Sequence, residues 1–128
     1  MALVPGLEKM FEHVVTEKDT AISVRSGDVN VLSTPVLVAF CENAAVRAVK
    51  NELPENETTV GVRIDIQHLA PSAVGARVMF HARLESVEGR KLTFRVWARD
   101  GNGDIAHGTH VRMRVDRERF MKQATERS

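Results

Sequence analysis

Residues 33–51 read STPVLVAFCENAAVRAVKN, and this stretch decides the fold of the chain. Its opening Ser-Thr-Pro is typical of a helix start, because a hydroxyl residue caps the first turn and proline is tolerated where an N–H would be unpaired. The stretch predicts a helix from about Pro35 to Asn51. Its interior polar positions are Glu42, Asn43, Arg47 and Lys50. A helix that is apolar on nearly every side is expected to be wrapped by other structure.

Downstream of this helix the sequence alternates between apolar and polar residues with a period of two, which predicts half-buried antiparallel strands. Four strands are expected, with Glu88-Gly89 and Asp100–Gly103 as turns between them. The residues expected to face the helix are Val62, Ile64, Ile66 and His68; Val78, Phe80, Ala82 and Leu84; Leu92, Phe94, Val96 and Ala98; and Thr109, Val111, Met113 and Val115.

Upstream of the helix lie two short β-prone runs, residues 11–16 and 21–25, which are separated by the polar residues 17–19. Both runs are expected to be strands. The terminal residues 1–8 and 121–128 are expected to be flexible, since the tail is charged and has little to pack against.

These elements predict an α+β fold in which an antiparallel sheet curls around one central helix, the hotdog arrangement. A chain of 128 residues is the common size of one domain, so residues 1–128 are expected to form a single domain. One such unit leaves sheet edges uncovered, and pairing two copies would hide them. We therefore expect a homodimer, or a dimer of dimers.

Composition bounds the possible partners and the compartment. A net charge of +1, with basic residues spread along the chain, offers no concentrated field for nucleic acid. The single cysteine, Cys41, cannot form an intramolecular disulfide, and no targeting leader opens the chain, so a reducing, cytoplasmic setting is expected. No apolar run approaches the roughly 20 residues that cross a bilayer, so no membrane partner is expected.

Glu42 is the most informative candidate residue. A carboxylate in an apolar helix loses several kcal/mol of hydration free energy unless it is paired or reaches a cavity. A structural explanation is an ion pair with Arg47 or with an arginine of a partner chain, or a position on the exposed stripe beside Asn43. The functional explanation is a general base or nucleophile that faces a cleft with little water.

His68 and Thr34 are the other two candidates. His68 continues the apolar face of its strand, so it is expected to point toward the helix, as a core residue or as part of a site. Thr34 is expected to cap the helix. The same helix start presents free N–H groups where a developing oxyanion could be held.

Other polar residues are given structural explanations. His107 and His110 are three residues apart in a strand and therefore lie on opposite faces, so no metal site is predicted. Cys41 is expected to be an unreactive core thiol. The basic residues of the last strand are expected to form a solvated face.

The sequence resembles the fluoroacetyl-CoA thioesterase-like branch of the hotdog superfamily. The resemblance spans roughly residues 30 to 120 and is carried by residues 33–35, 42–48, 60–62, 68–71, 84–90 and 108–110. It implies a dimeric acyl-CoA hydrolase in which Thr34, Glu42 and His68 occupy the positions of the catalytic residues. It also implies that Gly61 lies near the acyl group and Pro35 near the substrate, with coenzyme A entering as part of the substrate and no other cofactor.

One departure from that branch concerns the link over residues 26–32, which is short where the fluoroacetyl-specific enzyme carries a longer lid with phenylalanine. A short, medium or aryl acyl thioester is therefore expected as substrate. Two other functions remain open. One is a hotdog hydratase or dehydratase, although Asp65 points away from the face of His68. The other is an acyl-CoA-binding module without catalysis.

Overall fold

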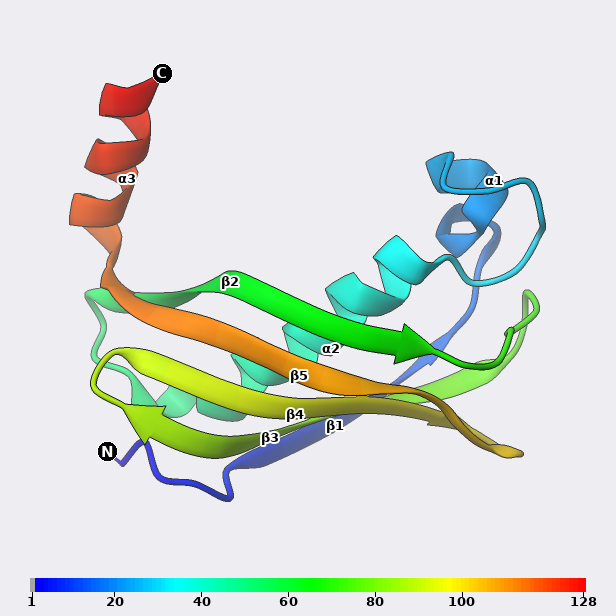
Figure 1. Cartoon of the computed structure of the whole chain (residues 1–128), viewed down its shortest axis with the longest axis horizontal. Coiled ribbons are helices and arrows are strands. Elements are labelled where there is room, and N and C mark those ends of the chain that lie inside the picture. Colours follow the sequence, from blue (N-terminus) through cyan, green and yellow to red (C-terminus); the bar gives the residue numbers. More distant parts are fainter. Residues whose placement is uncertain (1) are drawn as a thin grey trace.

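The computed structural model describes residues 2–128 as a curved antiparallel sheet of five strands, in the order β1-β3-β4-β5-β2, with one long helix inside the curve (Figure 1). This is the predicted hotdog arrangement, and the predicted helix is confirmed. The strands are β1 (Glu8–Val14), β2 (Glu57–His68), β3 (Arg77–Glu88), β4 (Lys91–Asp100) and β5 (Gly103–Asp116). The helices are α1 (Ala21–Val24), α2 (Thr34–Val49) and α3 (Arg117–Arg127), with short 3₁₀ turns η1 (Glu17–Asp19) and η2 (Lys50–Glu52).

The core lies between α2 and the concave face of β3 and β4. The predicted inward faces of these two strands are confirmed, since their alternate residues are fully buried. From α2 the buried side chains are Leu37, Cys41, Ala44, Ala45 and Val49. Burying this apolar surface is the main stabilising contribution that the sheet and helix make to each other.

The predicted inward face of β5 is wrong. His110 and Arg112 are buried, whereas Thr109 is exposed. The reason is a shift in register between Ala98 and Arg99 of the neighbouring strand, which places His110 rather than Thr109 opposite Phe94. A shift of one residue turns every following side chain to the other face of a sheet.

The inward face of β2 is partly as predicted. Ile64, Ile66 and His68 are half-buried on the helix side, but Val62 is 56% exposed because the register with β5 shifts between Gly61 and Arg63. Since β2 stands at the edge of the sheet and pairs only with β5 among residues 2–128, its outer edge is open.

The segment before α2 differs from the prediction in one element. The first β-prone run is confirmed as β1, although it spans residues 8–14. The second run is the short helix α1, because the Thr20 side chain caps it by accepting from the Ser23 N–H and Arg25 ends it in the left-handed conformation.

Helix α3 rises from the end of β5 and stands apart from the sheet (Figure 1). At the other end of the chain Leu3 and Leu7 lie against the core. The flexibility expected for residues 1–8 and 121–128 stays a prediction, as does the single domain, and Met1 lies outside the described residues.

The convex face of the sheet, opposite α2, carries the alternate, mostly polar residues of β3 and β4. Trp97 of β4 lies on this face beside His81 of β3, with the two rings stacked at 4.8 Å between centroids and 9° between planes. The guanidinium carbon of Arg95 lies 5.4 Å from the centre of the indole ring.

Candidate active site

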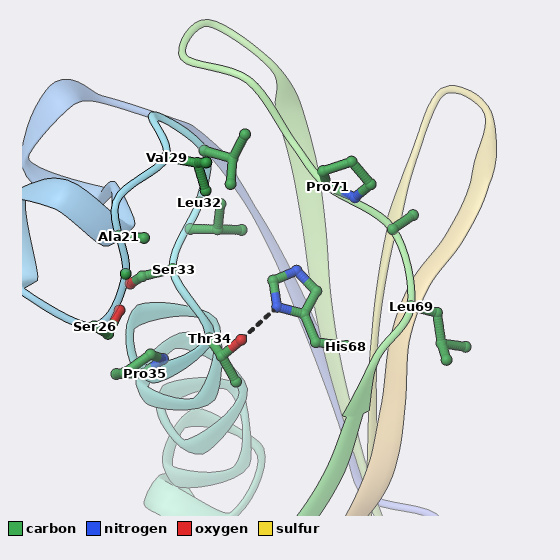
Figure 2. Close-up of a pocket in the computed structure, with 13 residues that line it drawn as sticks. Ala21, Ser26, Val29, Leu32, Ser33, Thr34, Pro35, His68, Leu69 and Pro71 are labelled. Carbon is green, nitrogen blue, oxygen red and sulfur yellow. Dashed lines mark hydrogen bonds between the residues drawn. The ribbon is translucent and has the colours of Figure 1, made fainter.

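The start of α2 and the end of β2 meet at one hydrogen bond. The hydroxyl of Thr34 lies 2.8 Å from Nδ1 of His68 (Figure 2). The prediction that Thr34 caps the helix is wrong, because the cap is Ser33, whose side chain accepts from the N–H of Val36 at 3.2 Å. Capping by Ser33 leaves the Thr34 hydroxyl free to bond the imidazole.

His68 faces the helix, as predicted, and borders a cavity of about 350 Å³. Burial lowers the pKa of His68, which favours the neutral imidazole. Its Nε2 is buried and has no hydrogen-bond partner among residues 2–128. The cavity walls include Val29, Leu32, Thr34, Pro35, Leu69 and Pro71 (Figure 2).

Glu42 lies two turns further along α2, about 12 Å of helix rise from Thr34. Its side chain is 37% exposed, and its Oε2 is 3.8 Å from a terminal nitrogen of Arg112 and 3.9 Å from Nε2 of His110. The ion pair with Arg47, one of the structural explanations for Glu42, is not formed, since the Arg47 guanidinium instead lies 4.2 Å from the centre of the Phe11 ring. Within residues 2–128, His110 is the histidine that comes within 4 Å of Glu42, so the structure does not bring His68 to this carboxylate.

Arg112 is a buried cation, with 8% of its side chain exposed. Its Nε donates to the hydroxyl of Thr59 at 2.8 Å, and one terminal nitrogen donates to the Thr59 carbonyl at 2.9 Å. Burial lowers the pKa of Arg112, but a guanidinium remains charged at neutral pH. The prediction that the basic residues of the last strand form a solvated face is therefore wrong at Arg112.

His110 has a defined protonation pattern. Its Nδ1 lies 2.8 Å from the backbone oxygen of Arg63, and a carbonyl only accepts, so Nδ1 carries the proton. Nε2 then holds a lone pair that accepts from Arg112 at 3.1 Å. Burial lowers the pKa of His110, in agreement with a neutral ring.

Gly61 lies beside this cluster at the irregularity in β2. A β-carbon at this position would stand 2.9 Å from Oε2 of Glu42 and 3.3 Å from both Arg112 and His110. Glycine therefore lets the backbone approach the carboxylate closely.

Cys41, His107 and Asp65 lie where the sequence predicts them. Cys41 is buried, and burial raises the pKa of its thiol to about 12, so the thiolate is scarce. His107 is exposed whereas His110 is buried, so the two imidazoles lie on opposite faces of β5, and Asp65 is exposed.

Residues 2–128 contain no cluster of three or more His, Cys, Asp or Glu side chains arranged to hold a metal ion. Over the same residues, no helix combines the length and apolar character of a membrane span.

Sequence reasoning missed His110, Arg112 and Thr59 as members of the site. The polar character of the first two suggested an outward face, and the register shift that turns them inward leaves no mark in the composition of the strand. The signal in the sequence that could point to His110 is the segment Gly108-Thr109-His110, which is part of the family resemblance.

Comparison with known proteins places this geometry in a family. Residues 15–118 match the model of the family described as "FlK: Fluoroacetyl-CoA-specific thioesterase". The chain belongs to this family. A curated fluoroacetyl-CoA thioesterase from Streptantibioticus cattleyicolor is 40% identical over 90 residues, which are 70% of this chain and 65% of that relative.

Solved structures of similar proteins superpose over nearly the whole chain. A structure of the fluoroacetyl-CoA thioesterase FlK is 30% identical, with a TM-score of 0.94, over 100% of this chain and 99% of that one. A Thermus thermophilus protein described as a thioesterase superfamily member is 30% identical, with a TM-score of 0.88, over 98% and 96% of the two chains. The hotdog fold and the family are thus established for this chain.

Proposed function

We propose that this protein is an acyl-CoA thioesterase that hydrolyses a short, medium or aryl acyl thioester with the help of Glu42. The observation that supports this most is the half-buried carboxylate of Glu42, held beside a buried arginine and next to a glycine that leaves space at the same point. Such a carboxylate can act on a substrate carbonyl, which a carboxylate on an outer surface cannot do selectively.

The reaction requires an oxygen nucleophile at the thioester carbonyl. Glu42 either removes a proton from the attacking water or attacks the carbonyl itself and is then released by water. In both routes the C–S bond breaks, the thiolate of coenzyme A takes up a proton, and a carboxylic acid is formed. Both routes remain open.

Thr34 and His68 are proposed to act at the other end of the site. The hydroxyl of Thr34 and the N–H groups at the start of α2 would stabilise negative charge on the carbonyl oxygen. His68 orients Thr34 through the bond at 2.8 Å: its Nδ1–H donates to the hydroxyl, which leaves the hydroxyl's own proton for the carbonyl oxygen. Nε2 of this neutral ring is buried and unpartnered among residues 2–128, and it passes a proton to the leaving thiolate only after it has taken one up. Since about 12 Å of helix separates Thr34 from Glu42, the substrate would lie between them.

The substrate is proposed to enter beside Gly61 and Pro35. Pro35 lines the cavity at His68, and Gly61 borders the carboxylate. The named relatives act on fluoroacetyl-CoA. The short link over residues 26–32 favours a broader acyl group in this chain. The proposed chemistry uses protein side chains only, with coenzyme A as part of the substrate and the cytoplasm as the setting.

A homodimer is proposed because β2 leaves its outer edge open. Val62 and Leu69 are 56% and 58% exposed along or just beyond this strand, and Ile66 is only partly buried. An open edge with apolar side chains is a surface that a second copy can pair with.

The alternative function of a different class is an acyl-CoA-binding module without catalysis. It is kept because binding and hydrolysis of acyl-CoA would use the same cleft. A hydratase is less favoured, since Asp65 is exposed on the face opposite His68.

The decisive experiment measures thiol release from a panel of acyl-CoAs by the wild type, by Glu42→Ala and by Glu55→Ala. Glu55 is an exposed glutamate outside the site and serves as the matched control. We expect Glu42→Ala to lose at least about a hundredfold in kcat while Glu55→Ala keeps wild-type rates. Binding of acyl-CoA without turnover by the wild type would instead establish the binding module.

A further inference from the structure

We infer that His110 is a positioning residue that aims the guanidinium of Arg112 at the carboxylate of Glu42 and at the space beside Gly61. This inference rests on the proposed thioesterase function and assigns His110 a role in it. The role is carried by a chain of contacts that runs from the backbone of β2 through two side chains of β5 to α2.

The first contact fixes the imidazole. Nδ1 of His110 donates to the carbonyl of Arg63 at 2.8 Å, immediately after the irregularity in β2 that starts at Gly61. The ring is fully buried, and its centre lies 6.3 Å from that of Phe94. It therefore has one orientation and one tautomer, because the carbonyl accepts from only one of its nitrogens.

The second contact fixes the guanidinium. Arginine is a long, flexible side chain, and Thr59 binds two of its nitrogens but leaves the third. That third nitrogen donates to Nε2 of His110 at 3.1 Å and is the one that lies 3.8 Å from Glu42. Without His110 this nitrogen would lose its acceptor and could turn away from the carboxylate.

The charges around His110 agree with this arrangement. The charged groups that face its ring are Arg112 on β5 and Glu42 on α2, while β2 presents the Arg63 carbonyl. A proton on Nε2 would replace an acceptor with a second cation beside Arg112 and would break the contact. The neutral ring is thus the form that positions Arg112.

The two hydrogen bonds of His110 can be separated by substitution. The amide of asparagine reaches the place of Nδ1 and can keep the bond to Arg63, whereas the longer glutamine reaches the place of Nε2 and can keep the bond to Arg112. We expect His110→Asn to lose about tenfold to a hundredfold in kcat with KM changed less than about threefold, and His110→Gln to stay within about fivefold of the wild type. His107→Asn, on the exposed face of the same strand, is the control and should match the wild type.

The conservative variant gives a second readout. Glutamine keeps the acceptor for Arg112 and asparagine removes it, so recovery of kcat in His110→Gln separates a positioning role from a merely structural one. Equal losses in both variants, or a wild-type kcat in His110→Asn, would overturn the role of His110.

A measurement that does not depend on activity tests the role of His110 independently of the proposed thioesterase function. Nitrogen-15 NMR of the imidazole at neutral pH should show the proton of His110 on Nδ1 and an unprotonated Nε2. A proton on Nε2 would overturn the inference even in an active enzyme. Conversely, the expected tautomer in a protein that hydrolyses no thioester would leave the contact chain in place and remove the function.

Discussion

Thr34 and His68 are separated by 34 residues in the sequence, yet the hydroxyl of one lies 2.8 Å from Nδ1 of the other. This contact joins the start of α2 to the end of β2 at the rim of the cavity. It exists because Ser33, and not Thr34, supplies the helix cap.

Replacing Thr34 by valine should therefore lower activity without unfolding the helix. We expect a loss of about tenfold to a hundredfold in kcat, because the oxyanion donor and the partner of His68 are removed together. Thr34→Ser keeps the hydroxyl and should retain most of the activity. Steady-state kinetics on the best acyl-CoA provides the measurement, and equal activity of the valine and serine variants would speak against a role for the hydroxyl.

The complementary substitution, Ser33→Ala, should affect stability. Loss of the cap should lower the free energy of unfolding by about 1 kcal/mol. Urea unfolding followed by circular dichroism measures this, with the exposed Ser128→Ala as control. An unchanged midpoint would show that the bond to the Val36 N–H contributes nothing.

Adding one methyl group at Gly61 should disturb the carboxylate. In Gly61→Ala the new β-carbon would stand 2.9 Å from Oε2 of Glu42, so this side chain must move. We expect kcat/KM to fall at least about tenfold with a folded protein. Gly101→Ala, in a turn with open space around the position, is the control. Wild-type kinetics in Gly61→Ala would mean that Glu42 needs no close approach of the backbone.

Acidification should destabilise the protein through three histidines that are buried or half-buried. Burial lowers the pKa values of His68, His81 and His110 below the ordinary value of 6.5, so the unfolded chain takes up protons at a higher pH than the folded chain. Stability should be complete above about pH 6.5 and decline as the pH falls from there toward the folded pKa values. Urea unfolding at several pH values tests this, and His110→Gln should weaken the dependence. A stability that rises on acidification between pH 7 and 5.5 would contradict it.

The open edge of β2 should control association. Val62→Lys places a charge on this edge and is expected to shift a dimer at micromolar concentration toward monomer. Met10→Lys is the matched control, because Met10 is 50% exposed on β1, the strand at the opposite edge. Sedimentation velocity distinguishes the two species. A wild type that is monomeric at this concentration, or a Val62→Lys variant as dimeric as the control, would rule out pairing through this part of β2.

The elements with strong periodicity could be predicted from sequence. The faces of β3 and β4 followed from alternation, and α2 followed from its hydroxyl and proline start. The run over residues 21–25 was assigned to the wrong state because its β-branched residues outweighed Thr20, whose side chain caps a single helical turn. The capping hydrogen bond therefore determines the helical state of this segment, and the β propensity of its residues does not.

The site could be predicted only in part, for a geometric reason. Glu42 and His68 could be predicted because each interrupts an apolar pattern, and Thr34 because it stands at the helix start before Pro35. His110 and Arg112 were assigned to solvent, as isolated polar residues usually are. One register shift near Ala98 turned them inward, and their burial is explained by mutual hydrogen bonds that no single residue reveals.

The position of Trp97 has a practical consequence. It is the sole tryptophan of a chain that contains no tyrosine, and it stacks on His81 on the side of the sheet away from α2. The intrinsic fluorescence of this protein therefore arises from an indole on the face of the sheet opposite the cleft. Its fluorescence will report unfolding of the sheet, whereas binding of a thioester will need an extrinsic fluorescent label on the face of the sheet that packs against α2.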